Sequence, residues 1–273
     1  MPGLRVFPSA TRCTSSRMAY SGKYAASSGN VLLCEPMTEK RVVIAIDGPA
    51  GAGKSTVARR VAERLGYAHI STGALYRAVA LWALRLGTEL TDMYRLTQLA
   101  QEARIELLPE NGRVLLNGED VTEAIRLPEV SDAASKISAV PGVRRALLPV
   151  QRAIAQENSV VMEGRDIGSV VFPEAQVKIF LDADPAERVQ RRALEREHEG
   201  ETANTTQVAG ELRARDQRDR TRREAPLLQA PDAELVDTTG LSLDEVEEIV
   251  LRLVRSRISN GKAVANSAAD TRS

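Results

Sequence analysis

Cysteine, lysine and aromatic residues are all scarce in this chain of 273 residues. The two cysteines, Cys13 and Cys34, lie near the N-terminus, so the remainder can form neither a disulfide nor a cysteine-ligated zinc site, as is usual in a reducing cytoplasm. Three phenylalanines, five tyrosines and one tryptophan are too few for the stacking platforms of a nucleic-acid motor. Of the 37 basic residues six are lysine and the other 31 are arginine, which binds phosphate in a bidentate manner. A GC-rich genome explains most of these arginines better, so only clustered ones indicate a phosphate site.

Neither an excess of one charge nor a long hydrophobic run is present. Acidic and basic residues number 37 each and the isoelectric point is about 6.8, so no overall field attracts nucleic acid or an anionic membrane. No apolar run approaches the roughly 20 residues that a membrane-spanning helix requires. We therefore expect a cytoplasmic protein with no nucleic-acid or membrane partner. Its length and its hydrophobic content of 43% suit one large α/β domain with insertions.

The most informative segment is a glycine-rich loop at residues 48–56. It matches G-x-x-x-x-G-K-[ST], the phosphate-binding loop (P-loop). An apolar run over 42–46 predicts a buried strand before the loop, and Val57, Val61 and Leu65 recur at helical spacing after it. The residues expected to bind a nucleoside triphosphate are Gly48, Pro49, Ala50, Gly51, Ala52, Gly53, Lys54, Ser55 and Thr56.

The loop contains each group that a triphosphate site needs. Its amides and the helix N-terminus direct partial positive charge toward an anion. Lys54 can reach the β- and γ-phosphates, and the Ser55 hydroxyl can bind Mg²⁺. The motif predicts the phosphoryl donor and leaves the acceptor open.

Strands and helices alternate along the rest of the chain. Further buried strands are predicted at 66–70, 160–162, 177–181 and 235–238. A helix over 130–156 should break or kink at Pro141, and an amphipathic helix over 243–254 closes the pattern. This alternation predicts an α/β fold with a doubly wound parallel sheet, whose ligand lies beyond the carboxyl ends of the strands.

A small antiparallel module interrupts the alternation. Apolar runs at 105–108 and 114–116 flank a turn that contains Asn111-Gly112, which is typical of a β-hairpin. Residues 121–122 are a candidate third strand. We interpret the module as a β insertion in the parallel fold.

The two ends of the chain differ from the middle. Residues 1–40 are rich in serine, alanine, glycine and arginine and show no sustained periodicity. Two interpretations remain: a disordered or mis-assigned N-terminal extension, which we favour because Met37 stands just before the first strand, and a transit peptide. Residues 259–273 are small and polar, which predicts a flexible tail.

Four segments occur in an order that is typical of one enzyme family. They are residues 48–55, Ser71-Thr72-Gly73-Ala74-Leu75-Tyr76-Arg77, Glu163-Gly164-Arg165-Asp166-Ile167-Gly168-Ser169-Val170-Val171-Phe172-Pro173 and Arg215-Asp216-Gln217-Arg218-Asp219-Arg220. Together they resemble the bacterial cytidylate (CMP/dCMP) kinases, nucleoside monophosphate (NMP) kinases of the P-loop class, over residues 41–258. The resemblance implies transfer of the γ-phosphoryl group of ATP to CMP or dCMP with Mg²⁺. It also implies a monomer with a core, an NMP-binding insertion over about 72–158 and a helical lid over about 186–205.

The resemblance further implies which residues bind the acceptor. They are Thr72 at the cytosine ring, Arg77 and Arg165 at the phosphate, Arg144 and Asp166 at the base, Ser135, Arg215 and Asp219 at the sugar, and Arg222 close to the nucleotide. On chemical grounds, the cytosine amino group needs an acceptor, which Asp166 or Thr72 could supply. The spacing i, i+4, i+7 places Arg215, Asp219 and Arg222 on one helix face, although a solvated helix with ordinary ion pairs has the same spacing.

The lid and one departure complete the comparison with the family. Arg188 or Arg192 would place a guanidinium over the γ-phosphoryl group, whereas Arg196 is interpreted as part of a solvated helix face. The family usually has Asp-Ser-Gly where this chain has Ser71-Thr72-Gly73, so one carboxylate near the expected Mg²⁺ site is lost. Asp182 follows an apolar strand, as a Walker B acid would, but is interpreted as structural. The implied catalytic residues are Lys54, Arg165, Arg188 and Arg192.

Other functions compete with this interpretation. A P-loop kinase for UMP, AMP or a metabolite such as shikimate would keep the loop and change the base-reading residues. A regulatory GTPase is disfavoured because no Asn-Lys-x-Asp guanine motif occurs in the chain. A nucleic-acid-dependent ATPase is disfavoured by the neutral charge and the few aromatic residues.

Overall fold

The computed structural model describes residues 41–108, 110, 112–198 and 204–270, with side chains up to residue 259. The predictions of an N-terminal extension or a transit peptide fall on residues 1–40 and lie outside the described residues.

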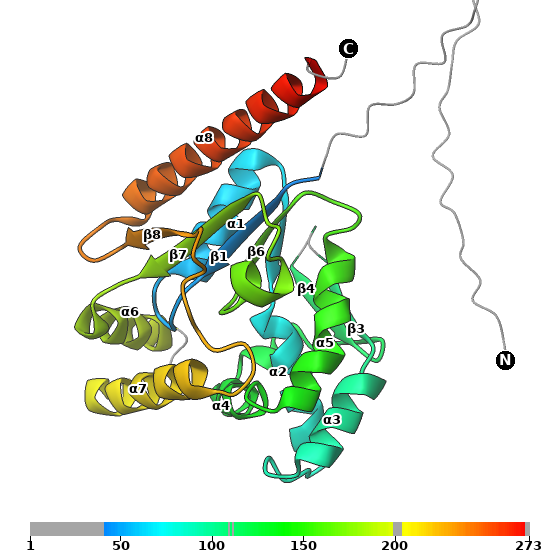
Figure 1. Cartoon of the computed structure of the whole chain (residues 1–273). Helices are drawn as coiled ribbons and strands as arrows, with labels where there is room; N and C mark the ends of the chain where they lie inside the picture. The colour runs from blue at the N-terminus through cyan, green and yellow to red at the C-terminus, as the bar shows by residue number, and fades with distance from the viewer. Residues whose placement is uncertain (1–40, 109, 111, 199–203, 271–273) are drawn as a thin grey trace, which may run out of the picture. The chain divides into compact units, whose positions relative to one another are not determined.

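A five-stranded parallel sheet with the order β2-β6-β1-β7-β8 forms the centre of the fold (Figure 1). Its strands are β1 (Val43–Asp47), β2 (Ala68–Ser71), β6 (Val160–Glu163), β7 (Val177–Asp182) and β8 (Glu234–Asp237). Every residue of β1 is buried, because this strand has neighbours on both sides and helices on both faces. The four further strands predicted from apolar runs are all present, each within two residues of its expected bounds.

Helices cover both faces of the sheet. Ile44 and Ile46 of β1 face α1 (Lys54–Leu65) and α8 (Leu243–Asp270) in one hydrophobic cluster. Val43 and Ala45 belong to a second cluster with residues of α5 (Pro141–Ile154) and of the π-helix η2 (Ile167–Val171). Successive β1 side chains therefore point to opposite layers, as strand geometry requires. The prediction of a doubly wound α/β fold is confirmed.

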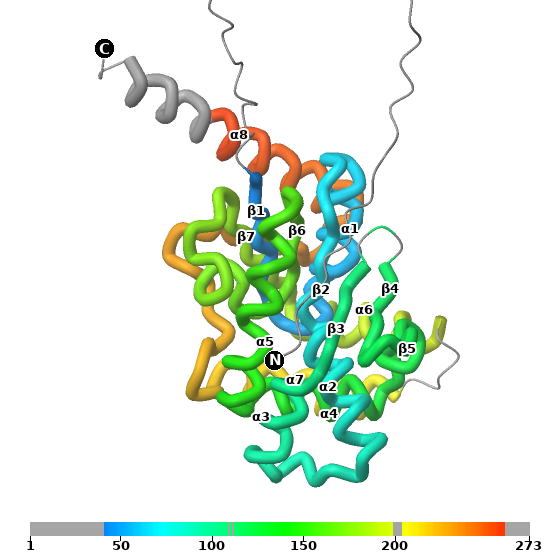
Figure 2. Tube along the Cα trace, turned by 90° about the vertical axis from the view of Figure 1, so that its right-hand side faces the viewer, coloured from blue at the N-terminus to red at the C-terminus, as the bar shows by residue number. Residues whose placement is uncertain are grey.

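A second hydrophobic core lies within residues 74–147 and shares no buried residue with the clusters of the sheet. It is formed by α2 (Gly73–Arg85), α3 (Met93–Glu102), η1 (Ala124–Arg126), α4 (Pro128–Ile137), part of α5 and the antiparallel strands. Those strands are β3 (Ile105–Leu108), β4 (Arg113–Leu116) and β5 (Glu119–Asp120), next to α2 in Figure 2. The predicted β insertion is confirmed, although its third strand lies two residues before the expected 121–122.

Proline explains how the predicted long helix is divided. Helix α4 ends at Ile137 and α5 begins at Pro141, in the first helical turn, where a missing N–H costs nothing. The expected break at Pro141 is therefore confirmed. At the C-terminus α8 continues to Asp270, beyond the helix predicted over 243–254, and the flexible tail over 259–273 stays a prediction. Residues 262–270 contain four alanines and no proline, which favours a helix.

Two further helices follow the sheet strand β7 and its loop. They are α6 (Pro185–His198) and α7 (Thr205–Thr221), which contact one another. Residues 199–203, within the predicted lid, lie outside the described residues. Asn204 caps α7, since its side-chain oxygen accepts hydrogen bonds from the amides of Thr206 and Gln207.

Candidate active site

The P-loop leaves β1 at the carboxyl edge of the sheet and enters α1. Gly48 has a φ of 146°, and a Cβ there would lie 1.9 Å from the carbonyl oxygen of Leu181 in β7. Only glycine therefore fits at the start of the loop. Gly53, with a φ of 83°, occupies the N-cap position of α1, whose first amides point toward the loop.

Lys54 is buried inside this loop. Its Nζ donates a hydrogen bond to the carbonyl oxygen of Pro49 at 2.6 Å. Burial, together with the nearby charge of Arg165, lowers the pKa of Lys54 to about 7. A bound anion would offset the effects of burial and of Arg165 and raise the pKa of Lys54 again, as expected for a lysine that binds phosphate.

Glu163 has a central position that the sequence did not predict. It ends β6 beside β1 and is 5% exposed. Its Oε1 accepts hydrogen bonds from the hydroxyls of Ser55, at 2.9 Å, and Ser71, at 2.5 Å. Burial alone would raise the pKa of Glu163, but the charge of Lys54 and the hydroxyl of Ser71 outweigh it and hold the pKa below its usual value. Glu163 is therefore a buried carboxylate beside the P-loop serine.

These groups fit a Mg²⁺ ion that is bound chiefly by phosphate oxygens. No group of three or more histidine, cysteine, aspartate or glutamate side chains that could hold a metal occurs in the described part of the chain. Mg²⁺ in phosphoryl-transfer enzymes needs only one or two protein oxygens besides phosphates and waters. The Ser55 hydroxyl and the ionised Glu163 meet that need, and Glu163 supplies a carboxylate where Ser71 has lost one.

One cavity of about 380 Å³ extends from the P-loop to the acceptor residues predicted from the sequence. Seven arginines are among the described residues that line it: Arg77, Arg126, Arg144, Arg165, Arg192, Arg215 and Arg222. Thr72, Ser135, Asp166 and Asp219 also line it, so the structure brings every predicted acceptor residue to one space. Arg126 and Tyr76 are additional lining residues that sequence reasoning missed.

Three of these arginines have no side-chain partner. Among the described residues, the side chains of Arg77, Arg126 and Arg215 form no hydrogen bond or ion pair, and the buried Nε of Arg77 is unsatisfied. Burial and the charge of Arg165 lower the pKa of Arg215 to about 10. Burial likewise lowers the pKa of Arg77. Unpaired guanidinium groups that repel one another are costly unless an anion joins them.

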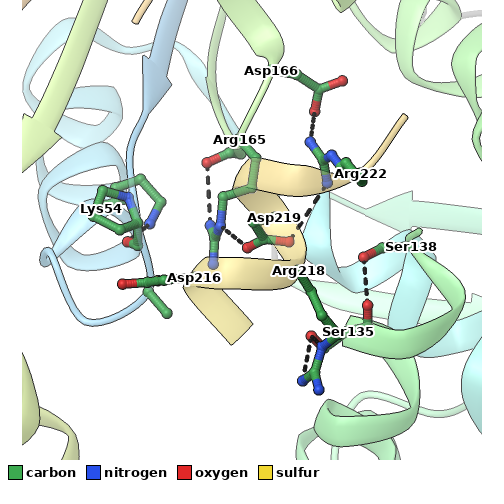
Figure 3. A network of polar contacts seen from close by, with 12 residues as sticks. Lys54, Ser135, Ser138, Arg165, Asp166, Asp216, Arg218, Asp219 and Arg222 are labelled. Atoms are coloured by element: carbon green, nitrogen blue, oxygen red, sulfur yellow. Dashed lines mark hydrogen bonds and ion pairs between the residues drawn. The ribbon is translucent and has the colours of Figure 1, made fainter. Parts of the chain in front are cut away.

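Asp219 links the two ends of the acceptor site (Figure 3). Arg165 donates from Nε to Oδ2 of Asp219 at 3.0 Å, and Arg222 lies 3.6 Å from Oδ1. The three residues at i, i+4, i+7 thus face the same cavity, as the spacing predicted, although α7 ends at Thr221 and Arg222 is its C-cap.

The base-reading residues form a buried network. Asp166 contacts Arg144 through Oδ2 and Arg222 through Oδ1, the latter at 3.4 Å. The guanidinium of Arg144 lies 5.5 Å from the centre of the Tyr76 ring, within range for a cation–π contact. Thr72 occupies the N-cap position of α2, but its hydroxyl donates to the carbonyl oxygen of Glu163 at 2.9 Å and accepts no hydrogen bond from the helix amides. The Thr72 oxygen keeps lone pairs that can accept from a ligand.

Ser135 already has a protein partner. Arg218 donates from NH2 to the Ser135 hydroxyl at 3.0 Å, which joins α7 to α4 (Figure 3). Ser135 lines the cavity as predicted, and Arg218 is a neighbour that sequence reasoning did not identify. Nothing local in the sequence connects residues 83 positions apart.

The two lid arginines have different surroundings. Arg192 lines the cavity and forms an ion pair with Glu195 at 2.9 Å. Arg188 does not line it, because its guanidinium is buried behind the P-loop, bound to Asp216 and to the carbonyl oxygen of Ala50 at 3.1 Å. The sequence offered Arg188 as an alternative to Arg192 for the lid guanidinium. In the structure the Arg188 guanidinium lies away from the cavity that would hold the phosphates.

Two remaining predicted residues are placed outside the cavity. Arg196 forms an ion pair with Glu211 of α7, and its side chain is 15% exposed, so it is more buried than the solvated helix face that was predicted. Asp182 accepts a hydrogen bond from the amide of Ala183 at 2.9 Å and does not line the cavity, which agrees with a structural role.

Comparisons with known proteins agree with this geometry. The family model "Cytidylate kinase" matches residues 44–256. A cytidylate kinase of Solibacter usitatus is 60% identical and covers 82% of this chain and 97% of its own length. One of Symbiobacterium thermophilum is 50% identical and covers 79% of this chain and 97% of its own length.

A solved structure gives a more distant likeness. Shikimate kinase from Acinetobacter baumannii, in complex with shikimate, is 17% identical with a TM-score of 0.40 and covers 80% of this chain and 95% of its own. That likeness carries no argument about the substrate. The family model and the two relatives are decisive: the chain belongs to the cytidylate kinase family.

Proposed function

We propose that this chain transfers the γ-phosphoryl group of ATP to CMP or dCMP, giving ADP and CDP or dCDP. The observation that carries the proposal is the single cavity that joins the P-loop lysine to the Asp166 network through a series of arginines. One end suits a triphosphate, the other suits a base, and the positive charge between them suits the phosphates of both nucleotides. All of these groups come from one chain, so we propose that a monomer is the complete catalytic unit.

The donor end would hold the ATP phosphates. The loop amides and Lys54 would contact the β- and γ-phosphates, so Lys54 would leave its contact with Pro49. Ser55 and Glu163 would hold Mg²⁺, which when bound neutralises charge on the phosphate oxygens. Glu163 would keep the Ser55 hydroxyl oriented, because both groups already form a hydrogen bond.

The acceptor end would hold the monophosphate in line with the γ-phosphorus. Arg77 and Arg165 would bind the acceptor phosphate, Arg215 would contact the adjoining sugar, and the bound anion would offset the repulsion among the three guanidinium groups. The attacking oxygen is already anionic, so no strong general base is needed. Catalysis would then consist of positioning and charge neutralisation.

Base selection would rest on Asp166 and Thr72. A carboxylate oxygen of Asp166 can accept from the cytosine amino group, and Arg144 can donate to an acceptor on the ring. Uracil and thymine present a carbonyl oxygen instead of the amino group. That oxygen would face the Asp166 carboxylate unfavourably.

Helix α6 would complete the site when the lid closes. A second hollow of about 430 Å³ lies between α4 and helices α6 and α7 and shares Ser135, Arg192 and Arg215 with the main cavity. Movement of α6 and α7 toward α4 would fill this hollow and bring Arg192 closer to the phosphates. Closure would also exclude water and so suppress ATP hydrolysis.

The test is an acceptor panel. ADP formation from Mg·ATP would be measured with CMP, dCMP, UMP, AMP and GMP in separate reactions. We expect a strong response to CMP and dCMP and a weak one to UMP. A preference for AMP, or no response to any of the five, would contradict the proposed acceptor while leaving the P-loop assignment intact.

A further inference from the structure

Asp166 stands at the start of the π-helix η2 but does not cap it. An aspartate at an N-cap normally accepts hydrogen bonds from the next amides of its own helix. Here the Asp166 side chain forms no such bond and contacts Arg144 and Arg222 instead. Another group must therefore accept hydrogen bonds from the first amides of η2 if the Asp166 carboxylate is to remain available for the base.

Asp47, the last residue of β1, satisfies those amides. Its Oδ1 accepts from the amide of Ile167 and its Oδ2 from the amide of Gly168, both at 2.8 Å. The side chain reaches across 120 positions in the sequence and is 5% exposed. Asp47 also directly precedes Gly48, so one residue connects the P-loop to the base-reading segment.

The remainder of η2 is held independently of Asp47. Arg152 donates to the carbonyl oxygens of Val171, at 2.9 Å, and Val170, at 3.0 Å. The aliphatic part of Lys178 packs where a side chain on Gly168 would lie, 3.1 Å from its Cβ position. Loss of the Asp47 contacts would thus release the N-terminus of η2, next to Asp166, and leave its C-terminal end fixed.

Asp47 holds the start of η2 at an energetic cost. Burial raises the pKa of Asp47 to about 6, even though the two amides act in the opposite direction. The folded protein therefore bears the cost of a buried charge near neutral pH. A neutral asparagine would avoid that cost but could accept from only one of the two amides, so the carboxylate is what allows one side chain to hold both amides at the start of η2.

We propose that Asp47 is a positioning residue that caps η2 in place of Asp166 and so holds the Asp166 carboxylate toward the acceptor base. The inference rests on the proposed function, since it assigns to Asp166 the recognition of cytosine. Both oxygens of Asp47 are needed, because each accepts from one amide.

The test compares Asp47→Asn with the wild type and with Asp237→Asn. Asp237 is a matched control, because it also ends a strand of the sheet and accepts from a backbone amide, that of Thr239 at 2.9 Å, away from the cavity. kcat and KM for CMP and UMP would be measured, with the Kd of Mg·ATP and the thermal unfolding temperature. In Asp47→Asn the asparagine amide group faces a backbone N–H, so one of the two hydrogen bonds is lost.

We expect kcat/KM for CMP in Asp47→Asn to fall by about a factor of ten or more, mainly through KM, because a small misplacement of a binding group has effects of this size. The ratio of CMP to UMP activity should fall by a similar factor, while the Kd of Mg·ATP stays within about threefold. Asp237→Asn should match the wild type in all of these. If Asp47→Asn does not fold, Asp47→Ser, which keeps one short acceptor, provides the same comparison.

An Asp47 variant with the CMP-to-UMP ratio of the wild type would overturn the inference. Equal losses for ATP, CMP and UMP would also overturn it, because they would indicate a general structural role. A wild type that prefers AMP or accepts no nucleotide would instead contradict the proposed function, so the two failures are distinguishable.

Discussion

The hydroxyl of Ser55 donates a hydrogen bond to Oε1 of Glu163 at 2.9 Å, across the start of α1 and the end of β6. This contact joins the P-loop to the segment that carries Arg165 and Asp166. It also places an ionised carboxylate beside the serine that would bind Mg²⁺. Ser71 donates to the same oxygen, so Glu163 holds two hydroxyls at once.

Glu163→Gln should reduce kcat by about 10- to 100-fold, the usual cost of removing a group that orients a metal ligand. The amide keeps the size of the side chain but removes the negative charge that favours Mg²⁺. The apparent Mg²⁺ requirement should rise, which a titration of rate against Mg²⁺ would measure. Glu119→Gln, on an exposed carboxylate paired with Arg85, should leave both values unchanged. A variant with wild-type kcat and Mg²⁺ dependence would refute a role of Glu163 near the metal.

Arg188→Ala should cost stability more than chemistry. The substitution leaves Asp216 buried without its cation, and removal of one partner of a buried pair costs about 3–5 kcal/mol. Urea unfolding would measure this loss, and Arg188→Ala/Asp216→Ala should recover part of it. The folded fraction of Arg188→Ala should keep its kcat within about tenfold, whereas Arg192→Ala should lose far more if it supplies the lid guanidinium. A larger loss of kcat in Arg188→Ala than in Arg192→Ala would indicate that Arg188, not Arg192, supplies the lid guanidinium.

Arg77→Met should separate binding from stability. The methionine removes a guanidinium whose buried Nε has no partner and which other arginines repel. The free enzyme should therefore unfold at the same temperature or higher, while KM for CMP rises by about 100-fold as a phosphate contact is lost. Arg85→Met, which removes only an exposed ion pair, should change neither quantity by much. An unchanged KM would show that Arg77 does not contact the acceptor.

Local patterns were sufficient for most of the fold. The strand before residues 48–56 and the helix after them, the alternation of later elements and the break at Pro141 all follow from neighbouring residues. The positions of Thr72, Arg165 and Asp219 around one cavity follow from motif order and helical spacing. These signals are short-range, so one sequence contains them.

The remaining features depend on contacts between distant segments. Glu163 stood inside a recognised motif, but its role depends on Ser55, which is 108 positions away. Arg126 is a single arginine in a short helix, without any pattern around it. Arg188 has the same spacing as Arg192, and only the buried Asp216 shows that the two differ. The continuation of α8 to Asp270 was missed because small polar residues weaken the amphipathic pattern.

The pKa of Asp47 predicts a pH-dependent difference in stability. The folded pKa of about 6 lies above the usual value of 3.8, so the contribution of this group to stability is complete only below pH 3.8 and is lost as the pH rises through 6. The charged groups that act on it are Asp166, which raises the pKa, and Lys54, which lowers it. The free energy of unfolding of the wild type, relative to Asp47→Asn, should therefore fall by about 2 kcal/mol between pH 4 and pH 7.5.

Urea unfolding at several pH values would measure this change. The same subtraction with Asp237→Asn should stay flat over that range, because hydrogen bonds from the hydroxyl and amide of Thr239 hold the pKa of Asp237 below its usual value. Its contribution is lost only at lower pH. A flat difference for Asp47→Asn would mean that the Asp47 carboxyl titrates normally.

Lys54→Ala should abolish phosphoryl transfer. Lys54 is the only lysine that lines the cavity among the described residues, and its ammonium is held 2.6 Å from Pro49 within the loop that would bind the phosphates. Without Lys54, no positively charged side chain of the loop would stabilise the negative charge that develops on the transferring phosphoryl group. The arginines would not replace it, because they approach from the acceptor and lid sides. Lys136→Ala is the control, because Lys136 is exposed and paired with Asp132 on the surface of α4. Retention of more than about a tenth of kcat, equivalent to roughly 1.4 kcal/mol of barrier, would contradict the assignment of Lys54 to the chemical step.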